Sequence, residues 1–214
     1  MGKTFVATRL IDAWRGGGFR VGARKPVQSF ADPEGTDAAL LAAATGEQPE
    51  EVCPPQRWYR REMAPPMAAE SLGCPAFRVE DLLAELSWRT SDPLDIGVVE
   101  LAGGLRSPMA NDGDGIDFLE GLRPTGVVLV ADAGLGTLNA VLLSVEALRS
   151  LSDPEVGIFV VLNRFDVGVE LHRRNLAWLA DREHLLVWSA PGGLSELAGD
   201  LARLRQEGGD NPGS

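Results

Sequence analysis

The stretch M-G-K-T-F-V-A-T-R-L, residues 1–10, decides the predicted fold. Gly2, Lys3 and Thr4 match the second half of the phosphate-binding loop G-x-x-x-x-G-K-[ST], and the apolar residues after them have helical spacing. In such loops a glycine-rich first half wraps backbone N–H groups around phosphates, and a buried strand before it holds the loop in place. Because only Met1 precedes the motif, either the match is a coincidence or the first half of the loop and its strand are missing from this sequence.

The rest of the chain alternates between strand and helix patterns. Short, continuous, β-branched runs are typical of buried strands. The predicted strands are Phe19–Ala23, Gly97–Glu100, Val127–Ala131, Val156–Leu162 and Leu185–Trp188. The predicted helices are Thr4–Trp14, Thr36–Ala44, Val79–Leu86, Leu138–Leu151, Glu170–Asp181 and Leu194–Arg205. This alternation predicts an α/β fold with a doubly wound, mostly parallel sheet and helices on both faces. The Gly2–Thr4 motif adds the expectation that the fold is of the P-loop NTPase-like type, with its first strand missing.

Length and composition predict one globular domain. The chain has 214 residues, of which 44% are hydrophobic, and this is enough for one substantial core. We expect a single domain over residues 1–205 and a disordered tail over residues 206–214, which contain Gly, Asp and Pro. No apolar run approaches the ~18 residues needed to span a bilayer, and no signal-peptide pattern is present at the N-terminus. The sequence therefore predicts a cytoplasmic protein with no membrane partner.

Charge and cysteine content restrict the classes of ligand. The formal net charge is -11 and the arginines are scattered, which argues against a nucleic-acid partner. Cys53 and Cys74 form no CxxC pair and have no His-rich partner segment, so we expect two free thiols. A metal ion, if bound, is then expected to have oxygen ligands.

Polar residues and glycines follow successive predicted strands, which is where parallel sheets bind ligands. The segments are Arg24–Ser29, Gly35–Asp37, Glu100–Leu105, Asp132–Asn139 and Asn163–Phe165. A fold that needed only packing would not place Lys, Glu, Asp, Asn and paired glycines at these positions. The pattern indicates a ligand site at one edge of the sheet.

Three positions suit Mg²⁺. Thr4 offers a hydroxyl, and Asp37 and Glu100 offer carboxylates, which together with phosphate oxygens make a hard oxygen shell. Glu100 ends a buried strand, where an unpaired carboxylate is costly and a cation resolves the cost. Asp37 taken by itself is better explained as the cap of the helix over residues 36–44. Lys3 is expected to neutralise phosphate charge, the alternative being a solvated terminal lysine.

The glycines and one asparagine also have two explanations each. Gly103, Gly104 and the turn over residues 134–136 either bring backbone N–H groups close to an anion or are simple turns. Asn163 can pair with a base edge through its acceptor and its donor, and an ordinary turn asparagine explains it equally well.

Taken in order, these residues resemble dethiobiotin synthetase, the ATP-dependent ligase that closes the ureido ring in biotin synthesis. The matching stretches are GKT at 2–4, KPVQS at 25–29, TDAALL at 36–41, APPMAA at 64–69, VVELAGGLRSPM at 98–109, VVLVADAGLGTLNAVLLSVEAL at 127–148 and VVLNRF at 160–165. The resemblance extends from the first residue to about Pro191. The ordered set is more specific than any single motif in it.

The resemblance implies a mechanism, cofactors and partners. One amine of 7,8-diaminononanoate forms a carbamate with CO₂, ATP phosphorylates the carbamate, and the second amine closes the ring, with ADP and phosphate as the other products. ATP and Mg²⁺ are the implied cofactors, small molecules the implied substrates, and a homodimer the implied assembly. Because no covalent enzyme intermediate forms, catalysis is mainly positioning and charge neutralisation.

The resemblance also implies roles for individual residues. The implied catalytic residues are Lys3, Lys25 and Ser29, with Lys25 and Ser29 beside the carbamate and the phosphoryl group. The implied nucleotide contacts are Gly2, Lys3, Thr4, Asn163, Pro191 and Gly192, with Asn163 reading the adenine. The implied metal ligands are Thr4, Asp37 and Glu100. The implied substrate contacts are Ser29, Gly103, Gly104, Gly136, Thr137, Leu138 and Asn139, the last four receiving the substrate carboxylate across a dimer interface.

The sequence departs from the family pattern at three positions. Leu101 stands where the family usually has glycine in V-E-G-A-G-G, and we expect this side chain to alter the shape of the substrate site. Phe30 replaces a common glycine after the K-P-V-x-S run. Met1 falls where the family commonly has valine, whose codon GTG is also an alternative start codon, so we expect the true start to lie upstream. A stop codon immediately upstream would contradict this expectation.

Three other functions fit part of the pattern. A non-catalytic regulatory domain of the same fold explains an incomplete phosphate loop, but not the retained Lys25, Asp37 and Glu100. A partitioning-type ATPase switch has a similar loop, but it normally carries an Asp-rich strand end where residues 25–27 stand. A related amidating ligase with a larger acid substrate is normally a longer chain. The exact diamine or acid and the nucleotide preference are left open.

Overall fold

The computed structural model describes residues 2–30, 35–88 and 93–209. The chain divides into two compact units, residues 1–13 with 123–214 and residues 14–122. The sequence predicted one domain over residues 1–205. Each unit has strands and an apolar core of its own. Of the predicted tail, residues 206–209 belong to the last helix, whereas residues 210–214 lie outside the described residues, as does Met1.

The elements follow the predicted alternation of strands and helices. The helices are α1 (Lys3–Gly16), α2 (Asp37–Thr45), α3 (Pro49–Val52), α4 (Pro65–Ser71), α5 (Val79–Ala84), α6 (Gly115–Leu122), α7 (Thr137–Leu148), α8 (Glu170–Ala177) and α9 (Leu194–Gly209), with a 3₁₀ turn η1 (Pro55–Arg57) and a π-helical turn η2 (Trp178–Arg182). The strands are β1 (Val21–Arg24), β2 (Gln28–Ser29), β3 (Trp58–Tyr59), β4 (Ile96–Val99), β5 (Pro108–Ala110), β6 (Gly113–Asp114), β7 (Gly126–Asp132), β8 (Gly157–Asn163) and β9 (Leu186–Ser189). Every predicted strand and helix is present with slightly different ends, which confirms the α/β class.

The unit that contains both ends of the chain is built on a parallel sheet of order β7-β8-β9. β8 is the central strand, and its continuous apolar run is buried from Phe159 onwards, as expected of a strand that is paired on both sides. The register places Asp132 opposite Asn163 at the carboxyl ends of β7 and β8. These two residues therefore lie at the edge where a ligand is expected.

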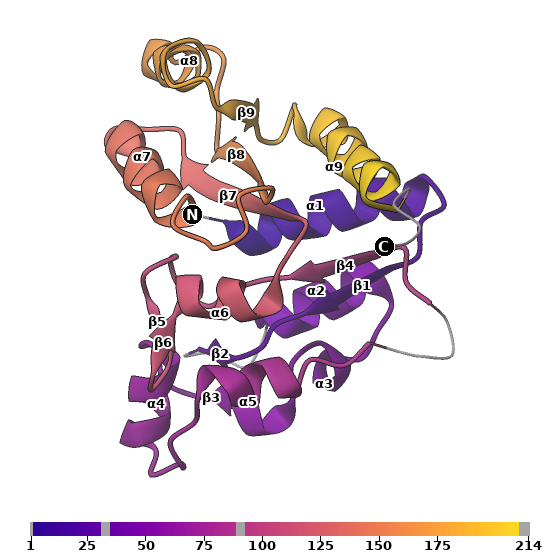
Figure 1. Ribbon diagram of the computed structural model, residues 1–214, viewed down its shortest axis with the longest axis vertical. Coiled ribbons are helices and arrows are strands. Elements are labelled where there is room, and N and C mark those ends of the chain that lie inside the picture. Colours follow the sequence, from indigo (N-terminus) through magenta and orange to yellow (C-terminus); the bar gives the residue numbers. More distant parts are fainter. Residues whose placement is uncertain (1, 31–34, 89–92, 210–214) are drawn as a thin grey trace. The chain divides into compact units, whose positions relative to one another are not determined.

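The second unit pairs segments that are far apart in the sequence. β1 and β4 are parallel and lie side by side in Figure 1, with Arg24 opposite Val99. β2 and β3 form a second parallel pair, and β5 and β6 form an antiparallel hairpin. The mostly parallel prediction therefore holds for the pairings within each unit, apart from this short hairpin. None of the helices in the described part of the chain is long and apolar enough to cross a bilayer.

The core of this unit contains a close backbone approach at Gly115, the first residue of α6. A Cβ atom at this position would lie 2.5 Å from the carbonyl oxygen of Leu105 and 3.3 Å from Cδ1 of Leu101. A carbonyl oxygen belongs to the backbone and cannot move away as a side-chain end can. Glycine is therefore needed here for space.

We predict opposite effects of two glycine-to-alanine substitutions in helices. Gly115→Ala should lower the free energy of unfolding by about 1–3 kcal/mol, because the new methyl group overpacks against the backbone. Gly199→Ala in α9 should raise it by about 0.5–1 kcal/mol, because no neighbouring atom lies within 4 Å of the added Cβ and alanine favours helix. Urea denaturation of both variants measures the difference. Equal effects would contradict the packing described at Gly115.

Candidate active site

Strand register brings Lys25 and Glu100 to the same edge of the β1–β4 pair. Arg24 and Val99 are the last paired residues, and Lys25 and Glu100 are the residues that follow them. The backbone N–H of Glu100 donates to the carbonyl of Arg24 at 2.9 Å, and that of Lys25 donates to the carbonyl of Val52 at 2.8 Å. Both side chains are thus held by backbone that is itself hydrogen-bonded.

The Lys25 ammonium is the centre of this site. The residue is only 2% exposed, and its Nζ donates to Oε1 of Glu100 at 2.7 Å and to Oδ2 of Asp37 at 2.7 Å. A third contact reaches the carbonyl of Leu101 at 3.4 Å. Burial by itself lowers the pKa of Lys25, but Glu100 and Asp37 outweigh burial and raise the pKa above its ordinary value. The side chain therefore carries its positive charge at neutral pH.

Asp37 does not cap α2, which corrects the simpler of its two explanations. Thr36 is the N-cap, and its hydroxyl accepts the backbone N–H of Ala39 at 3.3 Å. Thr36 can take this role because it stands one residue earlier and threonine is among the favoured N-cap residues. The Asp37 carboxylate is left to face Lys25, with its side chain 42% exposed.

Asp37 and Glu100 are the two carboxylates of the second unit that could contribute to a cation site. The Asp37 and Glu100 oxygens converge on one positively charged atom, Lys25 Nζ, and hard carboxylate oxygens are the ligands that Mg²⁺ prefers. Among the described residues no three His, Cys, Asp or Glu side chains gather as a metal cluster. A Mg²⁺ ion would therefore need further oxygens, as the predicted set with Thr4 and phosphate supposes. Thr4 belongs to the other unit, so its place in this set stays a prediction.

Two further predicted residues of the second unit have defined partners. The Ser29 hydroxyl donates to the carbonyl of Met63 at 2.6 Å. Gly103 has a φ of 71°, and the N–H of Gly104 donates to Oγ of Ser107 at 2.9 Å. A Cβ on Gly103 would lie 2.8 Å from the Ser107 Cβ, so the turn requires glycine for both conformation and space.

The predicted nucleotide residues of the other unit gather around the end of β8. Gly2 has a φ of 83°, and a Cβ there would lie 2.3 Å from Nδ2 of Asn163, so only glycine lets the chain pass over this buried amide. α1 starts at Lys3, which places Lys3 and Thr4 at its N-terminus. The segment with Pro191 and Gly192 lies close to the same strand end. Ala190, directly before it, donates its N–H to the carbonyl of Leu162 and accepts the N–H of Phe165, on either side of Asn163.

The segment predicted to bind the substrate carboxylate forms the start of α7. Gly136 is the N-cap with a φ of 89°, and no atom lies within 4 Å of a Cβ added there. Thr137 is buried, and its hydroxyl has no hydrogen-bond partner among the residues described. The Asn175 side chain donates to the carbonyls of Ala133 and Gly134 at 2.9 and 3.1 Å and so fixes the preceding loop. Leu138 and Asn139 continue the same helix.

Comparison with known proteins identifies the family. A family model described as an AAA domain matches residues 1–185. The ATP-dependent dethiobiotin synthetase BioD of Caulobacter vibrioides (strain NA1000 / CB15N) is 38% identical over 157 residues, which cover 70% of this chain and 69% of that protein. The chain belongs to the dethiobiotin synthetase family. The Haloferax mediterranei synthetase is 34% identical over 193 residues, covering 89% and 79% of the two chains, and that of Caulobacter sp. (strain K31) is 33% identical over 207 residues, covering 94% and 88%.

Membership of the dethiobiotin synthetase family puts the departures at Leu101 and Phe30 in context. Leu101 is partly buried and packs against the core of the second unit, near the space that Gly115 leaves open. Phe30 packs edge-on against Trp58, with ring centroids 6.5 Å apart. Both side chains thus have packing partners, and the expected effect of Leu101 on the shape of the substrate site stays a prediction.

Sequence reasoning missed several residues that shape the site. Ser107 accepts the N–H of Gly104 only three residues away, and Asn175 contacts a loop 41 to 42 residues away. Neither the short turn nor the distant contact gives a sequence pattern that marks the residue. Glu47 accepts the N–H of Ala23 at 2.9 Å and pairs with Arg24 at 2.6 Å, which secures the strand just before Lys25. A glutamate that follows a helix by two residues gives no sequence signal for this role.

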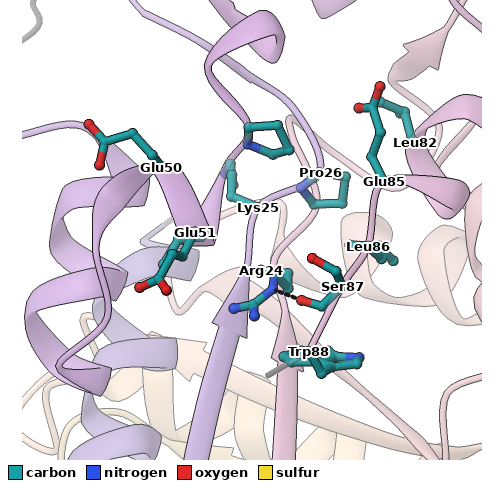
Figure 2. A pocket seen from close by; sticks show the side chains of 12 residues that line it. Arg24, Lys25, Pro26, Glu50, Glu51, Leu82, Glu85, Leu86, Ser87 and Trp88 are labelled. Carbon is teal, nitrogen blue, oxygen red and sulfur yellow. Dashed lines mark hydrogen bonds between the residues drawn. The ribbon is translucent and has the colours of Figure 1, made fainter. Parts of the chain in front are cut away.

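A cavity of about 330 Å³ borders the end of β1 and was not predicted. In Figure 2 the Arg24 guanidinium lies beside Ser87, whose carbonyl it contacts at 2.6 Å, and over the Trp88 ring at 4.6 Å. The residues that line the cavity are Arg24, Lys25, Pro26, Glu50, Glu51, Val52, Pro54, Leu82, Glu85, Leu86, Ser87 and Trp88. Of the predicted site residues, only Lys25 borders it.

We predict that the two carboxylates around Lys25 differ in their importance for stability. Glu100→Gln should lower the free energy of unfolding by about 3 kcal/mol, because the Glu100 side chain is 4% exposed and a buried ammonium loses its best-shielded partner. Asp37→Asn should cost about 1 kcal/mol or less, because its side chain is 42% exposed and water screens the charge. Chemical denaturation at pH 7 checks the order. A larger cost for Asp37→Asn would contradict the described burial.

We also predict that the two cysteines differ in reactivity. Cys53 is fully buried, and burial raises the pKa of its thiol to about 12, so almost no thiolate forms at pH 8. Cys74 is exposed. Ellman's reagent should therefore titrate one thiol quickly in the folded protein and two after denaturation. Cys74→Ser is the control: a fast thiol remaining in that variant would contradict the burial of Cys53.

Proposed function

We propose that the protein is a dethiobiotin synthetase that forms dethiobiotin from 7,8-diaminononanoate, CO₂ and ATP. The observation that carries the proposal is the buried Lys25 ammonium, held charged by Glu100 and Asp37 in a chain of this family. The reaction transfers the γ-phosphoryl group of ATP to a carbamate oxygen, and the second amine then attacks the carbamate carbon and expels phosphate. Every step gathers negative oxygens, which a fixed positive charge stabilises.

Lys25 is proposed to contact the oxygens of the carbamate and the transferring phosphoryl group. Its two carboxylate partners keep it protonated before the substrates bind, and the hydrogen bonds fix its direction. Lys3 is proposed to neutralise phosphate charge from the start of α1. A Mg²⁺ ion held by Thr4, Asp37 and Glu100 would neutralise phosphate oxygens further when bound.

Ser29 is proposed to receive the amine end of the substrate. Because its hydroxyl proton is donated to the Met63 carbonyl, the oxygen presents lone pairs that accept an N–H rather than a proton that it could give. Gly103 and Gly104 are proposed to line the same end of the substrate through their backbone.

The remaining assignments concern the nucleotide and the far end of the substrate. Gly2, Thr4, Asn163, Pro191 and Gly192 are proposed to bind ATP, with Asn163 pairing with the adenine edge. The N-terminus of α7 over residues 136–139 is proposed to receive the substrate carboxylate of a partner subunit in a homodimer. Nothing in the proposal requires nucleic acid or a membrane.

We predict that phosphate release from ATP, with Mg²⁺ and bicarbonate present, depends on 7,8-diaminononanoate. Lys25→Met should reduce kcat by about 10²–10³-fold, because one charged donor to the transferring group is lost. Arg149→Met, which removes an exposed positive charge at the end of α7, is the matched control and should keep wild-type activity. A coupled phosphate assay with and without the diamine measures both. Release that ignores the diamine in a folded protein would contradict the proposed function.

A further inference from the structure

Gln28 has a buried hydrogen-bond donor that no acceptor in the described part of the chain meets. The residue is 2% exposed, and its Oε1 accepts the backbone N–H of Ala38 at 3.2 Å. Its Nε2 has no hydrogen-bond partner among the residues described. Leaving a buried amide donor without an acceptor is unfavourable, so such a group calls for an explanation.

The position of Gln28 joins it to the Lys25 site. Gln28 stands in β2, three residues after Lys25, and the N–H that it accepts belongs to the residue directly after Asp37. Asp37 in turn contacts Lys25 Nζ at 2.7 Å. The Gln28 amide therefore connects the segment that carries Lys25 with the first turn of α2, which carries Asp37.

We propose that Gln28 binds substrate, with its Nε2 donating to an anionic oxygen of the carbamate or of the transferring phosphoryl group. This inference rests on the proposed function. Lys25 divides its donors between the carboxylates of Glu100 and Asp37. A second donor to the same oxygens therefore supplements the contact that Lys25 is proposed to make. A neutral amide cannot lose its proton and adds no further charge to the crowded site. It contributes a directed donor that only an incoming oxygen satisfies.

The competing explanation is that Gln28 only caps α2. Its Oε1 meets one of the free N–H groups of the first turn, as the Thr36 hydroxyl does for the next one. Thr36→Ala removes a cap contact of the same helix without touching the Gln28 donor. It therefore measures how far a weakened cap by itself changes catalysis.

Two substitutions of Gln28 separate the explanations by the order of their effects. Gln28→Glu keeps an acceptor for Ala38 but turns a negative group instead of a donor toward the bound oxygen. Gln28→Met has neither an acceptor for Ala38 nor a donor for the bound oxygen. Substrate binding predicts that kcat/KM falls by about 10–100-fold in Gln28→Met, the size expected for a hydrogen bond to a charged group, and further in Gln28→Glu. Capping alone predicts that Gln28→Glu is the more active of the two.

The experiment measures diamine-dependent phosphate release by wild type, Gln28→Met, Gln28→Glu and Thr36→Ala, with thermal unfolding of each. We expect Thr36→Ala to stay within a factor of about 3 of wild type while losing stability, in keeping with a lost cap of about 1 kcal/mol. A rise confined to the KM for diamine and bicarbonate assigns the oxygen to the carbamate, and one confined to the KM for ATP assigns it to the phosphoryl group.

The outcomes separate this inference from the function on which it rests. Wild-type protein without diamine-dependent release overturns both. An active wild type, with Gln28→Met no worse than Thr36→Ala or with Gln28→Glu more active than Gln28→Met, overturns the role of Gln28 alone. If Gln28→Met does not fold, Gln28→Glu still decides, because a folded Gln28→Glu with wild-type kcat/KM excludes a donor role.

Discussion

The second unit depends on one interaction, the Lys25 ammonium buried between Glu100 and Asp37. A buried positive charge is tolerated only when it is paired and hydrogen-bonded. The buried Glu100 carboxylate is the main partner of Lys25, and the more exposed Asp37 carboxylate contributes less to stability. Glu100 arrives there through the register of β1 and β4, and Asp37 through the start of α2, where Thr36 takes over the cap. The same contacts that stabilise this unit therefore also hold a buried positive charge at the position where we propose phosphoryl transfer.

Lysine is rare in this chain, and both lysines stand in motifs that the sequence analysis assigns to the active site. Lys3 and Lys25 are the only two lysines in the whole sequence, and the other positive side chains are arginines. An ammonium is a compact charge that can follow a moving phosphoryl group, whereas a guanidinium binds in a fixed plane. Arg24 shows the contrast: it is also buried, but it is engaged by Glu47, Ser87 and the Trp88 ring and serves to secure the strand. Lys3 and Lys25 are both at positions where the family resemblance expects phosphate.

The sequence predicted what local patterns determine. The apolar β-branched runs of β7 and β8 are visible in the sequence, and so are the polar residues after each strand. Short strands such as β2 and β3 and the proline-led helices α3 and α4 carry too few residues to show a period, so they were missed. The local pattern favours Asp37 as the cap of α2 when this residue is taken by itself, because Thr and Asp are both common N-cap residues and stand here one position apart. The pairing of Lys25 with Glu100 joins residues 75 positions apart, and the unused donor of Gln28 is visible only once its neighbours are known.

The central claim is that this protein phosphorylates a carbamate at the site of Lys25. The most direct test supplies ¹⁸O-labelled CO₂ with ATP, Mg²⁺ and 7,8-diaminononanoate and determines the isotope content of the released phosphate by mass spectrometry over times shorter than exchange with water. If a carbamate oxygen attacks the γ-phosphorus and leaves with it at ring closure, each phosphate carries one ¹⁸O from CO₂. Phosphate that contains no such label, released together with ADP, would show that water attacks ATP and would contradict the account.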